Sequence, residues 1–335
     1  MTQRIEQLRD WLQHAADLGE TSLTPASEDA SFRRYFRVHH AGGTAIAVDA
    51  PPEHEDSRPF VHVARALRAI GLNVPEILAV DYDLGFLLVG DLGETLYLDI
   101  LDEASAERLY GDALDALLVL QASAPEVPGG LPPYDRRRLL DELALFPAWF
   151  LDRHLDRPPG AVERTELEAA FEVLVASALE QPQVAVHRDY HSRNLMRVEV
   201  DNPGILDFQD AVIGPVTYDP VSLLRDCYVR WPRERVESWA LGYHARALQA
   251  GVLRERDEAR FLRWFDLMGL QRHLKVLGIF ARLWHRDGKP GYLDDLPRVL
   301  DYAIEVAADY PELGALHRLL AELPPLEGRA LAVDR

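Results

Sequence analysis

A polar run in the second half of the chain carries the residue types best suited to chemistry. His187-Arg188-Asp189 begins the run, Asn194 lies five residues beyond Asp189, and Asp207 follows thirteen residues after Asn194. Transfer of a phosphoryl group needs alignment, metal charge and a group that orients the attacking hydroxyl. A carboxylate at Asp189 could accept the hydroxyl proton, and Asn194 and Asp207 offer oxygen ligands of the kind that Mg²⁺ prefers. The spacing therefore predicts a phosphoryl-transfer site.

The joint spacing supports this hypothesis better than any one residue, because a single Asp or Asn in a loop commonly serves only a turn. Two further residues are expected to support the run. His187 is predicted to brace the loop by hydrogen bonding. Asp219, which precedes Pro220, is predicted either to cap the following helix or to brace the loop.

The elements that must position these residues follow from apolar periodicity. Between residues 22 and 89 short extended runs predict two hairpins and one helix. The hairpins are expected at 33–39 with 44–49 and at 76–80 with 86–89, and the helix at 59–70. Beyond residue 93 the chain is mostly helical, apart from one β-like island. Helices are predicted at 4–18, 104–122, 136–154, 161–181, 232–251 and 255–286, and the island at 184–186, 195–198 and 205–206.

This order of elements predicts a bilobal α+β architecture. Residues 1–89 form a small N-terminal lobe with an antiparallel sheet, and residues 90–95 form a linker. Residues 96–335 form a larger, mainly helical C-terminal lobe with the catalytic loop and the substrate site. Clefts between lobes are favoured places for ligands, so we expect the reactants to bind there.

Composition narrows the class of protein further. The 335 residues hold 36 Lys and Arg against 55 Asp and Glu, a net charge of −19, which disfavours nucleic acid and anionic membranes as partners. Cys227 is the only cysteine and residues 1–19 lack an apolar segment, so we expect a cytoplasmic location. No Gly-x-Gly, Walker A, His-Glu-x-x-His or Gly-x-Ser-x-Gly motif occurs, which argues against four common enzyme classes.

At residues 187–194, at Asp207 and at 214–223, the chain resembles the aminoglycoside phosphotransferase family of small-molecule kinases, which has the protein-kinase-like fold. Residues 49–53, 145–150 and 207–211 look like the cell-wall sugar 1-kinases of that family. The resemblance implies transfer of the γ-phosphoryl group of ATP, with Mg²⁺, to the anomeric C1 hydroxyl of N-acetylmuramate or N-acetylglucosamine in peptidoglycan recycling.

The resemblance also makes residues 1–89 the nucleotide-binding lobe, and it assigns roles to individual residues. Asp189 becomes the catalytic base, and Asn194 and Asp207 hold Mg²⁺. Adenine is expected against the linker, hydrogen-bonded to the backbone of Gly90 and Leu92.

One feature departs from the kinase pattern, which usually places a lysine on the third strand and a glutamate on the next helix. Here no lysine precedes Lys275, Asp49 occupies the matching strand end, and the helix at 59–70 has no acidic residue. We expect that the charges of this pair are exchanged. Arg33 or Arg34, helped by Ser31 and backbone N–H groups, is predicted to bind the phosphates in place of the lysine.

Three residues are predicted to contact the acceptor sugar. Trp149 could stack on a sugar face, with Tyr228 or Trp231 as alternatives, although such aromatic residues also build cores. Arg225 could bind the lactyl carboxylate of muramate, or could instead form a salt bridge within the protein.

Two other functions remain open at this stage. The first is an aminoglycoside kinase or another small-alcohol phosphotransferase of the same fold. The second is a pseudokinase that binds nucleotide or sugar without turnover, which the missing lysine suggests. We expect a monomer, because no obvious assembly helix is present in the sequence.

Overall fold

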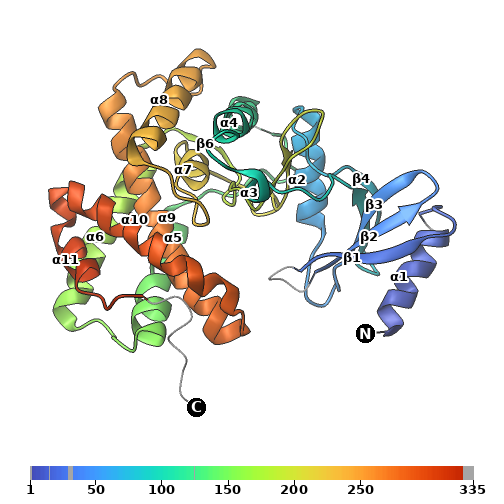
Figure 1. Ribbon diagram of the computed structural model, residues 1–335, viewed down its shortest axis with the longest axis horizontal. Helices are drawn as coiled ribbons and strands as arrows, with labels where there is room; N and C mark the ends of the chain where they lie inside the picture. The colour runs from blue at the N-terminus through green and yellow to red at the C-terminus, as the bar shows by residue number, and fades with distance from the viewer. Residues whose placement is uncertain (1, 15, 29–32, 124, 327–335) are drawn as a thin grey trace. The chain divides into compact units, whose positions relative to one another are not determined.

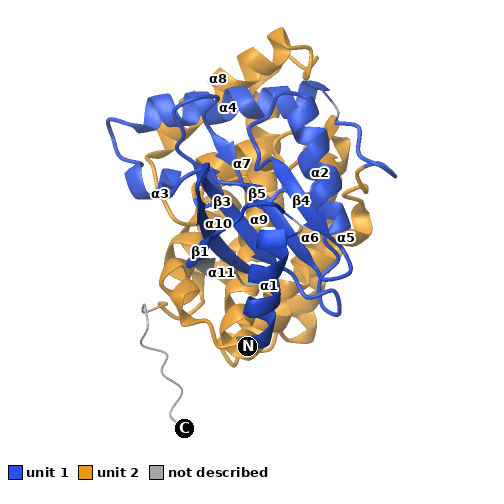
Figure 2. Ribbon diagram, turned by 90° about the vertical axis from the view of Figure 1, so that its right-hand side faces the viewer, with its two compact units in different colours: residues 1–130, 193–211 blue, residues 131–192, 212–335 orange. Residues whose placement is uncertain are grey.

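A computed structural model describes residues 2–14, 16–28, 33–123 and 125–326. The chain forms two compact units, shown in different colours in Figure 2. Unit 1 comprises residues 1–130 with 193–211, and unit 2 comprises residues 131–192 with 212–335. The predicted functional division at residues 89 and 96 stays a prediction, because it concerns which residues bind which ligand.

Unit 1 contains a five-stranded antiparallel sheet whose strand order is β1-β2-β3-β5-β4. Both predicted hairpins are confirmed, because Arg34 pairs with Asp49 across β2 and β3, and Asp81 pairs with Phe86 across β4 and β5. The sequence did not single out the first strand. The strands are β1 (Ser22–Glu28), β2 (Arg34–His40), β3 (Gly43–Asp49), β4 (Ile77–Asp81) and β5 (Phe86–Gly90).

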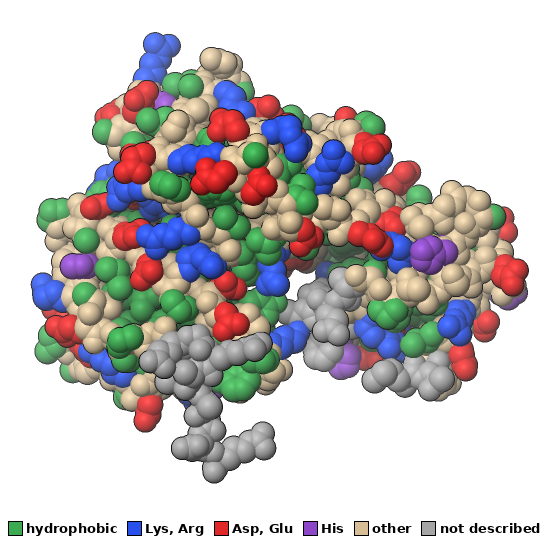
Figure 3. Space-filling view, in the orientation of Figure 1, with side chains coloured by type: hydrophobic (Ala, Val, Ile, Leu, Met, Phe, Trp, Pro, Cys, Tyr) green, Lys and Arg blue, Asp and Glu red, His purple; other side chains and the backbone are tan. Residues whose placement is uncertain are grey.

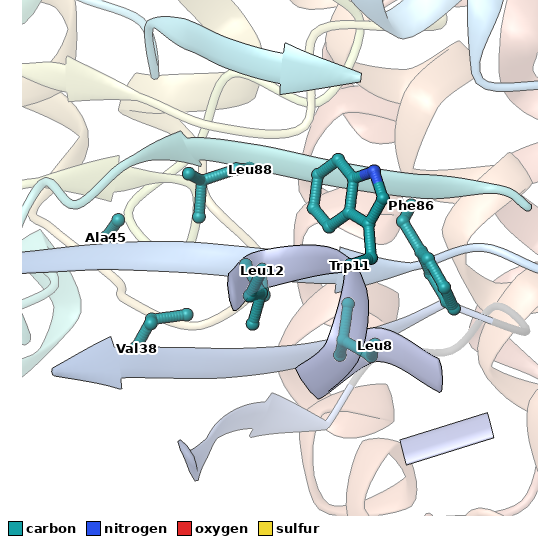
Figure 4. Packing of buried hydrophobic residues seen from close by; sticks show 8 residues of the cluster. Leu8, Trp11, Leu12, Val38, Ala45, Phe86 and Leu88 are labelled. Atoms are coloured by element: carbon teal, nitrogen blue, oxygen red, sulfur yellow. The ribbon is translucent and has the colours of Figure 1, made fainter. Parts of the chain in front are cut away.

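Successive side chains of a strand point to opposite sides, so this sheet has apolar side chains on both faces. One helix covers each face. Helix α1 (Thr2–His14) packs Leu8, Trp11 and Leu12 against one face, which Figure 4 shows. On the other face, Val48 of β3 packs against Val61 of helix α2 (Arg58–Ala69). Adjacent residues of β2 and β3 therefore contribute to different faces.

Unit 1 also contains residues 193–211, which follow Asp189 in the sequence. Strands β7 (Leu195–Met196) and β8 (Gly204–Ile205) form a short antiparallel pair. The amide of Asn202 donates to the hydroxyl of Tyr97 (2.6 Å) and to Asp112 (2.8 Å), and Ile205 N–H donates to the carbonyl of Asn73 (2.8 Å). These bonds fix the segment on helices α3 (Tyr97–Ile100) and α4 (Ala106–Ser123).

Unit 2 is mainly helical and is built around the long helix α9 (Glu258–Asp287), labelled in Figure 1. Every α9 residue from Trp264 to Ala281 is buried except Ile279. Helices α6, α7, α8 and α10 and the π-helix η1 all pack against it. The other elements are α5 (Arg136–Leu143), η1 (Phe146–His154), α6 (Ala161–Glu180), β6 (Gln183–Val186), β9 (Val212–Pro215), α7 (Tyr218–Leu224), α8 (Arg233–Gln249), η2 (Pro290–Asp295), α10 (Leu296–Asp309), η3 (Pro311–Leu313) and α11 (Gly314–Ala321).

Two sequence-based expectations for unit 2 need correction. The single helix predicted at 136–154 is wrong, because α5 ends at Leu143 and the π-helix η1 follows. Pro147 has no N–H to give to a continuing α-helix, which favours this break. Strand β9, which pairs antiparallel with β6, was not predicted.

Surface charge is mixed, since acidic and basic side chains are interspersed on the face seen in Figure 3. Ion pairs such as Arg233 with Glu237 (2.7 Å) lie at the surface, where each contributes little stability. Among the described residues, no helix is long and apolar enough to cross a membrane. An antiparallel-sheet unit and a helical unit confirm the predicted α+β class.

Candidate active site

The loop after β6 holds Asp189 in a braced conformation. The Asp219 carboxylate accepts the backbone N–H groups of His187 (2.6 Å) and Arg188 (2.9 Å). Arg188 has φ = 78°, a left-handed value that is uncommon for a residue other than glycine. Asp219 thus braces the loop, which was one of its two predicted roles. It does not cap the helix, because Thr217 occupies the N-cap of α7.

A buried charge network lies around this loop in unit 2. Arg188 forms an ion pair with Glu142, which also accepts the Tyr134 hydroxyl. The Lys275 ammonium lies 3.3 Å from Glu142 and donates to the hydroxyl of Tyr218 (3.0 Å). The sequence analysis missed Glu142 and the role of Lys275. The available signal was one of only two lysines in the chain, placed among apolar residues of a long helix.

Asp189 is half-buried in this positive surrounding. Burial by itself raises the pKa of its carboxyl, but Lys275, His191 and Arg188 together bring the pKa below its ordinary value. Asp189 is therefore ionised at neutral pH and able to accept a proton. Burial raises the pKa of neighbouring Asp219 to about 7, and the charge of Asp189 acts in the same direction.

The two predicted metal ligands lie together in unit 1. The Asn194 amide nitrogen is 3.4 Å from Asp207 Oδ2, and Gln209 Nε2 donates to Asp207 Oδ1 (2.6 Å). Leu206 N–H donates to the Asn194 carbonyl (2.9 Å), and this backbone bond holds the residue before Asp207 beside Asn194. Asp207 has φ = 61° and is exposed to solvent. An exposed carboxylate and an asparagine amide together offer oxygen ligands of the kind that Mg²⁺ takes and shares with phosphates.

Arg33 lies on the α2 face of the sheet in unit 1. Its guanidinium is 3.1 Å from Glu55 and lies over the ring of Phe60 in α2, 6.0 Å from the ring centre. Phe60 in turn stacks on Phe208 at 4.9 Å, and Phe208 directly follows Asp207. These contacts connect Arg33 to the segment that carries Asp207. Ser31, predicted to assist Arg33, lies outside the described residues.

Arg34 and Asp49 lie on the opposite, α1 face. Asp49 is fully buried and accepts Arg34 Nε (3.1 Å) and, from α1, Arg4 Nε (2.9 Å). The expected charge exchange between Asp49 and α2 is therefore wrong, because both partners of Asp49 lie elsewhere. The two predicted phosphate ligands are also separated, since Arg33, which directly precedes β2, lies over Phe60 of α2, whereas Arg34 pairs with Asp49. Of the two arginines, only Arg33 lies on the α2 face of the sheet.

The predicted linker is fixed to β2 by one arginine. Arg37 Nε donates to Asp91 (2.7 Å), and the Arg37 guanidinium also donates to the carbonyl of Gly93 (2.8 Å) and pairs with Glu94. Gly90 N–H donates to the carbonyl of Glu76 (2.9 Å). An adenine contact at Gly90 must therefore use its carbonyl oxygen. Leu92, the other predicted contact, lies in the same segment, with its side chain against Gly204.

The predicted sugar-contacting residues have different surroundings. Tyr228 is partly exposed, and its ring lies 5.5 Å from that of His191 in the catalytic loop. Trp149 is partly exposed on η1. Arg225 is buried and its guanidinium lies 2.7 Å from Asp266, so it forms the internal salt bridge that was its alternative role.

Comparison with known proteins places the chain in a family. Residues 22–265 match the phosphotransferase enzyme family. The chain belongs to that family. It is 49% identical to the N-acetylmuramate/N-acetylglucosamine kinase of Pseudomonas aeruginosa over 331 residues, covering 96% of this chain and 97% of that protein. It is 48% identical to the kinase of the same name from Pseudomonas putida over 330 residues, covering 96% of each.

A solved structure supports the fold of this phosphotransferase chain. The GDP complex of aminoglycoside 2'-phosphotransferase-IIIa matches with a TM-score of 0.62 and 16% identity, covering 91% of this chain and 99% of that one. The kinase-like fold and the family that the sequence predicted are therefore confirmed.

Proposed function

We propose that this protein transfers the γ-phosphoryl group of ATP to the C1 hydroxyl of N-acetylmuramate or N-acetylglucosamine, with Mg²⁺ as cofactor. The proposal rests on one observation above all. An ionised Asp189, held in a strained and braced loop, occurs in a chain almost half identical over its length to kinases named for these two sugars. Strain that surrounding bonds maintain is common at catalytic positions.

In this mechanism Asp189 acts on the acceptor. Its carboxylate orients the C1 hydroxyl and takes the hydroxyl proton as the oxygen bonds to the γ-phosphorus. The bond between the γ-phosphorus and the bridging oxygen of ATP breaks, and ADP leaves. Asp219 positions Asp189 through the two N–H bonds, and Lys275 keeps its carboxyl ionised.

The nucleotide is proposed to bind in unit 1 on the α2 face. Asn194 and Asp207 would hold Mg²⁺, which when bound neutralises charge on the phosphate oxygens. Arg33 is proposed as the phosphate-binding cation. Ile46 is the one partly exposed residue of β3 from Ala45 onward and pairs with Val89, next to Gly90, which gives adenine an apolar surface beside the linker.

The test is ADP release with N-acetylmuramate, N-acetylglucosamine and kanamycin, each with wild type and with Asp189→Asn. We expect turnover with an N-acetyl sugar, phosphate at C1 by NMR of the product, and a loss of at least 1000-fold in the variant. Turnover with kanamycin alone would retain the phosphotransferase activity but replace the acceptor. Binding of ATP and Mg²⁺ without turnover of any acceptor would support the pseudokinase alternative.

A further inference from the structure

Helix α9 presents a second basic residue on the face that carries Lys275. Arg282 follows Lys275 by seven residues, which at 1.5 Å and 100° per residue places it about 10 Å along the helix and about 20° around it. Ile279 lies between them on the same face and is the one residue of the stretch from Trp264 to Ala281 that is not buried. This face therefore opens beyond Lys275.

Arg282 has no ion pair with any described residue, whereas Arg260, Arg263 and Arg286 of the same helix each have one. Its Nε is buried with no hydrogen-bond acceptor among the described residues. The nearest acid, Asp287, is engaged by both Nε (2.8 Å) and an Nη (2.9 Å) of Arg286. Burial lowers the pKa of Arg282, and the like charge of Arg286 lowers it further. A buried donor without an acceptor is costly, so this site favours an anionic ligand.

The π-helix η1, which carries the partly exposed Trp149, packs against α9 beside this face. On one flank α9 meets η1, where Gly278 is so close to the backbone of Leu145 that a Cβ would lie 2.4 Å from its carbonyl carbon. Trp149 projects from that same π-helix. The Tyr228 ring lies 5.5 Å from His191 in the catalytic loop and 6.3 Å from Phe280, which is two residues before Arg282 and so about 160° around α9 from it. Trp149 therefore belongs to the element that packs beside this face, and Tyr228 lies at the catalytic loop.

We propose that Arg282 binds the carboxylate of the acceptor sugar, namely the lactyl group of N-acetylmuramate, and so sets the preference for this acid over N-acetylglucosamine. The assignment rests on the proposed function, because it takes the C1 hydroxyl to lie at Asp189. It replaces Arg225, whose guanidinium is already paired with Asp266. The planar guanidinium matches a carboxylate with two parallel hydrogen bonds, and N-acetylglucosamine has no such group.

The experiment compares kcat/KM for the two sugars in wild type, Arg282→Gln, Arg282→Lys and Arg263→Gln. We expect Arg282→Gln to lose about 50-fold with N-acetylmuramate and less than threefold with N-acetylglucosamine, and Arg282→Lys to recover part of the loss. Arg263→Gln is the matched control, because this arginine of α9 pairs with Glu312 (2.6 Å) and has no part in the Arg282 site, so the ratio of the two sugars should stay unchanged.

The two sugars separate failure of this assignment from failure of the proposed function. Activity on N-acetylglucosamine does not need Arg282 and so reports on the proposed function alone. An equal loss with both sugars, or no loss with either, would overturn the carboxylate assignment. A wild-type protein inactive on both sugars would overturn the proposed function and this assignment with it. Thermal melting of each variant verifies that it is folded.

Discussion

Replacing Asp219 by asparagine tests whether the brace beneath the catalytic loop controls turnover. The carboxylate accepts two consecutive N–H groups, one on each oxygen, at 2.6 and 2.9 Å. Asparagine has only one oxygen, and its amide nitrogen cannot accept. The variant therefore leaves one N–H of His187 or Arg188 without an acceptor, in a buried site and in a strained stretch of backbone.

The magnitude follows from the bonds that are lost. A buried N–H without an acceptor costs about 1–3 kcal/mol. The remaining bond also loses its charge assistance, which is worth roughly 1 kcal/mol more. If this cost of about 2–4 kcal/mol falls on the active conformation of Asp189, turnover drops about 30- to 1000-fold, at 1.4 kcal/mol for each factor of ten.

The assay is kcat for ADP release at pH 8 with saturating ATP and N-acetyl sugar. The matched control is Asp135→Asn, where the carboxylate accepts Arg138 N–H (3.0 Å) at the start of α5. Asparagine caps helices about as well as aspartate, so this control should stay within twofold of wild type. A kcat for Asp219→Asn within threefold of wild type would refute the reasoning.

The same variant has a second signature in the pH dependence of stability. Burial raises the pKa of Asp219 to about 7, above the roughly 3.9 of an unfolded chain. The folded state therefore binds this proton more tightly than the unfolded state does. Protonation of Asp219 stabilises the fold fully below pH ~4, and this stabilisation is lost as the pH rises to ~7. The melting temperature of Asp219→Asn should therefore rise relative to that of wild type between pH 5 and 8. Parallel plots of melting temperature against pH for the two proteins would contradict this.

The remaining predictions concern the nucleotide face and the charge network. Arg33→Ala should raise the KM for ATP about tenfold or more. Arg34→Ala should leave that KM unchanged but lower the melting temperature, because Asp49 loses a cation. The opposite pattern would place the phosphates on the α1 face. Lys275→Met should lower the free energy of unfolding by about 3 kcal/mol in a denaturant titration. It should also shift the acid limb of the pH profile of kcat/KM to higher pH, because Asp189 loses the cation that lowers its pKa. An acid limb at the wild-type pH would show that Lys275 does not have this role.

The fold and the reacting residues could be predicted from the sequence because their signals are local. Alternating apolar residues identified the two hairpins of the sheet, and helical spacing identified α2, α4, α6, α8 and α9. The spacing of Asp189, Asn194 and Asp207 pointed to phosphoryl transfer without any knowledge of their surroundings. Alternation along the extended run predicted at 33–39 could also have separated Arg33 from Arg34, since adjacent strand residues face opposite sides.

Which charges meet was decided only by tertiary structure. Arg225 pairs with Asp266, Lys275 with Glu142, and Asp49 with an arginine from α1, across 41, 133 and 45 positions of sequence. Such pairs depend on how helices and strands pack, and periodicity reports a residue's face without naming its partner. The same packing leaves Arg282 without a partner among the described residues, because the one nearby acid is already bound by its neighbour on the helix. Sequence determined the chemistry available to this protein, and packing determined which charged groups are free to take part in it.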